Sequence, residues 1–178
     1  MKKLTLMAIL FLSINNVFSQ KNFLWEKTDS LTKNKSQIYS DTKMFIAETW
    51  KSAKAVTEND DKESGIILIK GICSKSDTYS MAVYEYNFRY NVTFRMKENK
   101  YKINIDNVYC ESAYRGNERI KKIDPFEGDN CPETNPGWGG GLPKKKMILL
   151  MVSLKNELQL IIDNYTANIK LPSKNSDW

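Results

Sequence analysis

The sequence predicts a two-layer α+β domain: a five-stranded antiparallel sheet with two helices on one face, in the order strand, helix, four strands, helix. The first observation is an unbroken alternation of apolar and polar residues over positions 84–96. Its apolar members are Tyr84, Tyr86, Phe88, Tyr90, Val92, Phe94 and Met96. Successive side chains of a strand point to opposite faces, so this strand should have one buried face. The second observation is apolar residues at helical spacing in two other segments, which can cover that face.

The first nineteen residues are predicted to be an export signal rather than part of the fold. Lys2 and Lys3 precede the apolar run of residues 4–12, and Ser19 is the small residue that signal peptidase prefers. The alternative is a membrane anchor, but this run is too short for a hydrocarbon layer about 30 Å thick. We therefore expect cleavage before Gln20, residues 20–178 as one domain, and a periplasmic or secreted protein.

The charge of the mature chain argues against a nucleic-acid partner, and its hydropathy argues against a further membrane-spanning segment. It would carry 25 basic and 21 acidic side chains, spread along the sequence, for a net charge of +4. A mild and dispersed basic excess is typical of a solvated surface rather than of a nucleic-acid interface. No apolar run after the signal reaches membrane-spanning length, and the longest is residues 147–152.

The N-terminal elements follow from local signals. Residues 22–29 read as a short first strand. Asn34 and Gln37 have the spacing of a capping box, which starts a helix over residues 35–53. The apolar residues at helical spacing there are Ile38, Thr42, Phe45, Ile46, Thr49, Trp50 and Ala53.

The next strands are separated by polar turns. Residues 56–58 and 66–73 flank a polar segment that ends in Gly65, as expected of a hairpin. A polar loop is expected at residues 74–77, before the long strand. Glu98-Asn99 predicts a tight turn, because asparagine tolerates positive φ, and a fifth strand with alternating polarity follows.

Residues 111–143 are predicted to be a long surface loop, because they lack periodicity and are rich in proline and glycine. A final helix starts after Pro143, and Pro172 follows its end. Its apolar stripe is Met147, Leu150, Met151, Leu154, Leu158, Ile161, Ile162 and Tyr165. With both helices on the apolar side of the sheet, the open face should present Arg89, Arg95, Lys102 and Asn104.

Three cysteines in an exported chain leave one unpaired if a disulfide forms. Cys110 and Cys131 bracket a loop-like segment that would gain most from closure, by roughly 3 kcal/mol in the chain-entropy model. Cys73 ends an apolar run and is expected to be a buried thiol. Three reduced thiols are the alternative.

The chain contains no histidine, which excludes histidine-activated nucleophiles and histidine zinc sites. The oxygen ligands of Asp124, Glu127, Asp129 and Asn130 fall close together in sequence, but their spacing is not that of an EF-hand and favours a solvated cluster. Residues 137–144 resemble a phosphate-binding loop only superficially, since Pro143 interrupts the pattern. We therefore assign no metal, cofactor or catalytic residue.

Three segments resemble a known family: the helix that ends in Trp50, residues 61–71 with the sequence DKESGIILIKG, and residues 94–102 with the sequence FRMKENKYK. The chain resembles exported bacterial domains of unknown function whose fold is like that of the TATA-box-binding protein (TBP-like). The resemblance covers residues 22–110, and the final helix by position only. Glu98-Asn99 replaces the family's usual Asp-Gly turn. The resemblance implies a fold and no activity.

Fold analogy alone would suggest DNA, but gripping DNA in that way needs a duplicated repeat, apolar wedges and a strongly basic saddle. One repeat, a polar open face and export argue against nucleic acid. The sequence therefore favours a non-catalytic binding module of the cell envelope for a protein, glycan or small ligand, with Trp138, Arg89 and Arg95 bordering the partner surface. The alternative is a carboxylate-based hydrolase with the 111–143 loop as a lid over Asp106, Glu111 or Asp124.

Overall fold

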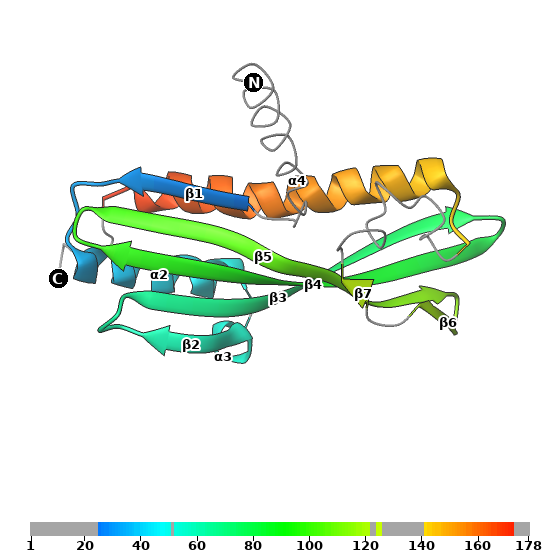
Figure 1. The fold of residues 1–178 in the computed structure, drawn as a ribbon, viewed down its shortest axis with the longest axis horizontal. Coiled ribbons are helices and arrows are strands. Elements are labelled where there is room, and N and C mark those ends of the chain that lie inside the picture. Colours follow the sequence, from blue (N-terminus) through cyan, green and yellow to red (C-terminus); the bar gives the residue numbers. More distant parts are fainter. Residues whose placement is uncertain (1–24, 51, 122–123, 126–140, 173–178) are drawn as a thin grey trace, which may run out of the picture.

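The computed structural model describes residues 25–50, 52–121, 124–125 and 141–172. It confirms the two-layer α+β architecture, with the helices α2 and α4 on one face of an antiparallel sheet (Figure 1). The main sheet order is β1-β5-β4-β3-β2, and β6 and β7 also pair with β5. The elements are β1 (Trp25–Ser30), α2 (Lys35–Thr49), α3 (Ala53–Val56), β2 (Thr57–Asp61), β3 (Ile66–Tyr79), β4 (Ala82–Lys97), β5 (Lys100–Arg115), β6 (Glu118–Lys121), β7 (Asp124–Pro125) and α4 (Lys144–Ile169).

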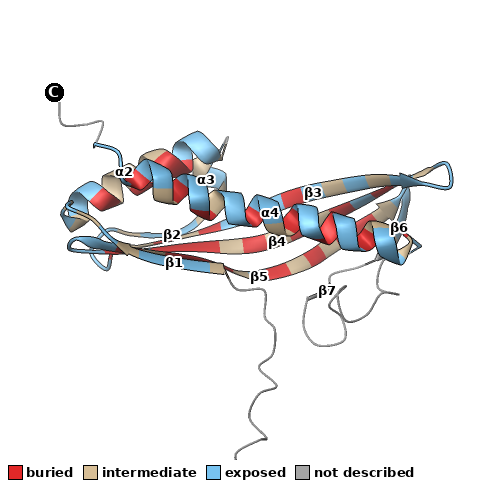
Figure 2. Ribbon diagram, turned by 90° about the horizontal axis from the view of Figure 1, so that it is seen from above, coloured by how far each residue is buried: buried red, intermediate tan, exposed pale blue. Residues whose placement is uncertain are grey.

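The long alternating strand is the centre of the sheet. β4 pairs with β3 on one side and with β5 on the other along nearly its whole length. All seven apolar residues of the alternation are buried, as their period predicts, and they face the helices (Figure 2). Among the described residues, the sheet therefore has one helix-covered face and one face without helices, which we call the open face.

The first helix begins where its capping box predicts. The Asn34 side chain accepts a hydrogen bond from the Gln37 backbone N–H at 2.9 Å, and the Gln37 side chain accepts one from the Asn34 N–H at 3.0 Å. The helix ends at Thr49, four residues earlier than expected, because Trp50 takes an extended conformation. Ala53 lies instead in the short helix α3.

The final helix is held at its C-terminal end by a residue from the loop before α2. The Lys33 ammonium donates to the Ile169 carbonyl at 2.8 Å, and it pairs with Asp41 of α2 at 2.7 Å. A cation at this position satisfies a free helix carbonyl and interacts favourably with the helix dipole. Lys33 thereby ties the C-terminal end of α4 to the middle of α2.

Three predicted loops are wrong in part, and the first is the hairpin segment between residues 58 and 66, of which residues 59–61 belong to β2. Residues 74–77 continue β3 instead of forming a loop, and residues 111–115 continue β5. Residues 118–121 then fold back on β5 as β6, so the predicted 111–143 loop begins with a hairpin. The hydrophobic period did not predict these strand extensions, because strands with partly solvated side chains tolerate polar residues. Pairing with β4 keeps residues 74–77 and 111–115 extended.

The turn between β3 and β4 uses residues that suit it poorly. Ser80 and Met81 both have positive φ, +49° and +62°, as a two-residue type I′ turn requires. The turns at Gly65, Asn99 and Gly116 place glycine or asparagine at positive φ instead. Met81 is also fully exposed. The tip of this hairpin therefore combines backbone strain with an exposed apolar side chain.

We expect Phe88→Ala to lower the free energy of unfolding by about 3–5 kcal/mol, because Phe88 is completely buried. Arg89→Ala, on the open face, should cost less than about 1 kcal/mol. Urea denaturation of both variants measures the difference. Equal midpoints would contradict the assignment of the two faces.

Met81→Gly should raise the free energy of unfolding by about 0.5–1 kcal/mol, because glycine removes the strain of a positive φ at small entropic cost. Asn99→Gly is the matched control, since asparagine already tolerates its φ of +56°. Denaturant midpoints compare the two. A loss of stability in Met81→Gly would mean that the methionine side chain is stabilising.

Candidate functional site

The open face carries polar side chains that bond to one another across neighbouring strands. Arg95 donates from Nη1 to Asn104 Oδ1 at 3.0 Å, and Asn104 donates from Nδ2 to Asp106 Oδ2 at 2.7 Å. At the edge of the sheet, Lys102 pairs with Glu26 of β1 at 2.7 Å. Arg95 is exposed, whereas these neighbours bury Asn104, which was expected to be solvated.

A second row crosses the open face closer to the β3–β4 turn. Arg89 Nε donates to Glu111 Oε1 at 2.5 Å, and about a third of each side chain is exposed. Next to this pair, Ser74 donates to Asn87 at 2.6 Å, and Asn87 donates to Ser112 at 3.2 Å. The register aligns these three residues on β3, β4 and β5. The open face thus presents hydrogen-bonded charged, amide and hydroxyl groups, with the exposed Ile72 opposite Arg89 on β3.

The residues of the predicted hydrolase are only partly brought together. Asp106 and Glu111 both belong to β5, but Asp106 bonds to Asn104 and Glu111 to Arg89. Asp124 lies in β7, where its backbone pairs opposite Cys110. Within the described residues, no group of three or more acidic or cysteine side chains is placed to hold a metal ion.

Several predicted residues lie outside the described ranges: Trp138, Cys131, Glu127, Asp129 and Asn130. Cys110 is buried, and its thiol donates to the Ser112 carbonyl at 3.5 Å. The bridge between Cys110 and Cys131 therefore stays a prediction, as does the place of Trp138 at the partner surface.

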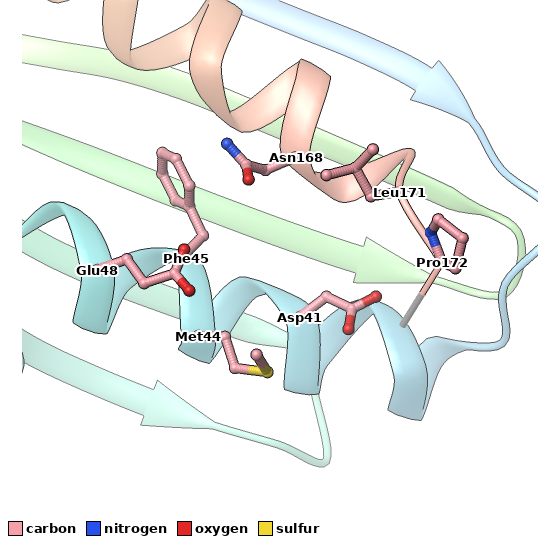
Figure 3. A pocket seen from close by; sticks show the side chains of 7 residues that line it. All are labelled: Asp41, Met44, Phe45, Glu48, Asn168, Leu171 and Pro172. Carbon is pink, nitrogen blue, oxygen red and sulfur yellow. The ribbon is translucent and has the colours of Figure 1, made fainter. Parts of the chain in front are cut away.

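A hollow between the two helices is too small for a ligand (Figure 3). It is enclosed by α2 residues, including Asp41 and Phe45, and by the end of α4 with Leu171 and Pro172. Its volume is about 30 Å³. This is room for one or two water molecules, since one water occupies about 10–15 Å³ by this measure.

A larger hollow, of about 310 Å³, lies at the outer edge of β3. Apolar side chains from three elements line it, among them Trp50, Ile72 and Leu160. Sequence reasoning missed this site. The signals that could have indicated it are Leu160, which lies off the apolar stripe of the last helix, and Gly71 within a strand.

Cys73, also on β3, is buried as expected and carries a free thiol. Burial, with a hydrogen bond to Glu157 as the second cause, raises the pKa of Cys73 to about 12. Burial also disfavours ionisation of Glu157, but hydrogen bonds from Lys75 and Cys73 outweigh it and lower the pKa of this carboxyl. Cys73 is therefore protonated at neutral pH, and it is not an activated nucleophile.

In the part of the chain that the structure describes, no helix combines the length and the apolar character of a membrane-spanning segment. A comparison with curated proteins finds no match.

Solved structures share the fold at low sequence identity. A DUF4468 family protein from Bacteroides ovatus ATCC 8483 has a TM-score of 0.56 and 11% identity, over 86% of this chain and 90% of that one. A TBP-like protein from Parabacteroides distasonis ATCC 8503 has a TM-score of 0.52 and 14% identity, over 82% of this chain and 93% of that one. The model of a family described as a domain of unknown function (DUF4468) with TBP-like fold matches residues 26–111. Residues 26–111 thus match the model of the DUF4468 family, and the chain shares the TBP-like fold of these structures.

Proposed function

We propose that this protein is an exported, non-catalytic binding module of the cell envelope and that it binds a polar partner through the open face. The proposal of export rests on the basic start, the short apolar run and the small residue at Ser19. The family brings no activity that could be carried over to this chain.

The observation that carries the proposed binding surface is the set of half-exposed polar groups held on a rigid sheet. Arg89 and Arg95 are fixed by Glu111 and Asn104 on a strand whose other face is core. Groups that are ordered before binding lose little conformational entropy when a partner arrives. Guanidinium groups in such a setting suit carboxylate, amide or sugar oxygens of a partner.

The charge states of the acidic groups favour binding over hydrolysis. A carboxylate-based hydrolase needs an acid whose pKa is raised within a cleft. Among the described residues, every carboxyl group whose pKa is shifted has a lowered pKa. Burial would raise these pKa values, but hydrogen bonds to the carboxylates outweigh it. These carboxyl groups are Asp29, Asp60, Asp61, Asp77 and Glu157.

Export is tested by the mass of the mature protein. The protein recovered from the envelope or medium of an expressing bacterium should begin at Gln20, because signal peptidase cleaves after a small residue. Intact-mass spectrometry gives the result directly. Recovery of residues 1–19 in a membrane-embedded chain would contradict the proposed location.

The open face is tested by the double variant Arg89→Gln and Arg95→Gln. Crosslinking to envelope proteins and glycans, followed by mass spectrometry, should show products on β4 and β5 of the wild type that the variant loses. Lys145→Gln, an exposed cation of the helical layer, is the matched control and should keep these products. Unchanged products in the double variant, with both proteins equally stable, would exclude the open face.

A further inference from the structure

We propose that the outer edge of β3 is a second binding site, which takes an extended segment of a partner protein as an added strand. This site borders the open face at Ile72, but it does not depend on the function proposed for that face. Its parts are an unpaired length of strand and the apolar hollow beside it.

The unpaired length arises because β2 is short. β3 has 14 residues, but β2 pairs only with its first part, Ile66–Ile69. Beyond that point, β3 pairs with β4 alone in the part of the chain that the structure describes. The open part of this edge ends at Asp77, because the Thr78 carbonyl accepts from Lys146 at 2.9 Å and the Thr78 N–H donates to Asp77 at 2.7 Å. On the other side of β4, β5 is instead paired along both halves of its far edge, by β1 and then by β6 and β7. An unpaired edge offers backbone donors and acceptors to an incoming strand.

The hollow lies where this unpaired edge begins. Ile72 pairs with Arg89 on the open face, whereas Tyr90 belongs to the helix-covered face, and both line the hollow. The hollow therefore reaches around the edge of β3 from one face towards the other. A strand added beside β3 would occupy this space, because its side chains also alternate between the two faces.

The lining is mainly apolar, with Thr49, Glu157 and Asn164 as its polar members, and it is partly open to solvent. Ile72 is 54% exposed and Leu160 55% exposed, and Trp50 and Ile161 lie partly buried beside them. An apolar cluster flanking a strand edge supplies the pockets for alternate side chains of the added strand. The ligand is accordingly a peptide with an apolar residue at every second position.

Gly71 explains how Tyr90 reaches the hollow. A Cβ atom at Gly71 would stand 2.2 Å from Cζ of Tyr90, so the ring occupies the space that any other residue would fill. Glycine weakens a strand, and a glycine inside a strand often marks a place where another group approaches the backbone closely. Here the close approach brings an aromatic ring to the start of the unpaired edge.

The charges along the edge favour a different protein over a second copy of this chain. Lys75 pairs with Glu157, and Lys146 pairs with Asp77 at 2.7 Å, so α4 is fastened along this part of β3. If two copies paired symmetrically about Lys75, this lysine would face the same lysine of the other copy, and in any register residues 73–78, CSKSDT, offer the hollow no large apolar side chain. Like charges directly opposite destabilise a strand pair. We therefore assign the edge to a partner's extended segment.

The test uses the mature protein and an array of ten-residue peptides in which apolar and polar residues alternate. Control peptides have the same compositions, but their apolar residues are grouped together. The alternating peptides should bind preferentially, and the amide resonances of residues 72–77 should shift. Every second backbone N–H of the bound peptide points towards β3, and the others point away from it. N-methylation of the first set should weaken binding at least about tenfold, whereas N-methylation of the second set should be tolerated.

Leu160→Asp should weaken the same peptide at least about tenfold. Leu149→Asp is the matched control, since Leu149 is 60% exposed on the same helix and does not line the hollow. Absence of binding at millimolar peptide, equal binding after N-methylation of either set, or equal effects of the two aspartates would overturn the proposal. A protein that dimerises by itself, and that Leu160→Asp makes monomeric in sedimentation, would overturn it in favour of a second copy.

Discussion

The fold depends on the packing of Tyr165 between the two layers. Its ring centroid lies 4.8 Å from that of Phe94, and 5.2 Å from those of Phe45 and Tyr101. Its hydroxyl shares a hydrogen bond of 2.9 Å with Thr42, whose hydroxyl also donates to the Ile38 carbonyl. Edge-to-face pairs add about 0.5–1.5 kcal/mol each beyond area burial. One side chain of α4 thus joins α2, β4 and β5, and the hydroxyl that its burial would leave unsatisfied has a partner.

This packing determines which surfaces can meet a partner. The helices cover the aromatic side of the sheet (Figure 2), and the opposite side presents partly or fully exposed charged groups, while Asn104 there is buried. The unequal lengths of the strands determine which strand edge remains unpaired. β3 and β4 extend well beyond β1 and β2 towards the end of the molecule where β6 lies (Figure 1). The extension of β3 past the end of β2 leaves the unpaired edge and the hollow at its start.

Sequence reasoning predicted the elements that have a strong local signal. The period of two along β4 was identified with the correct buried residues, and so was the stripe of α4, except that Ile161 is only partly buried and the buried Ile169 was missed. The capping box at Asn34 gave the correct start of α2, but of its predicted apolar stripe Thr49 is exposed, and Trp50 and Ala53 are only partly buried. The open face followed from the same alternation. The extensions of β3 and β5 were missed, because residues 74–77 and 111–115 carry no sustained apolar period and are held extended by β4. The hollow at β3 was missed because its residues come from distant parts of the chain.

The sequence by itself therefore determined the fold class, the helix-covered face and the absence of histidine chemistry, because periodicity and composition are local properties of the chain. Only the tertiary structure decided where strands end, which of their edges remain unpaired and which side chains gather beside them. Strand pairing is a contact between residues far apart in sequence, and no local pattern records it. The meeting of Trp50, Ile72 and Leu160 at one edge is such a contact, and it exists only after the two layers have packed.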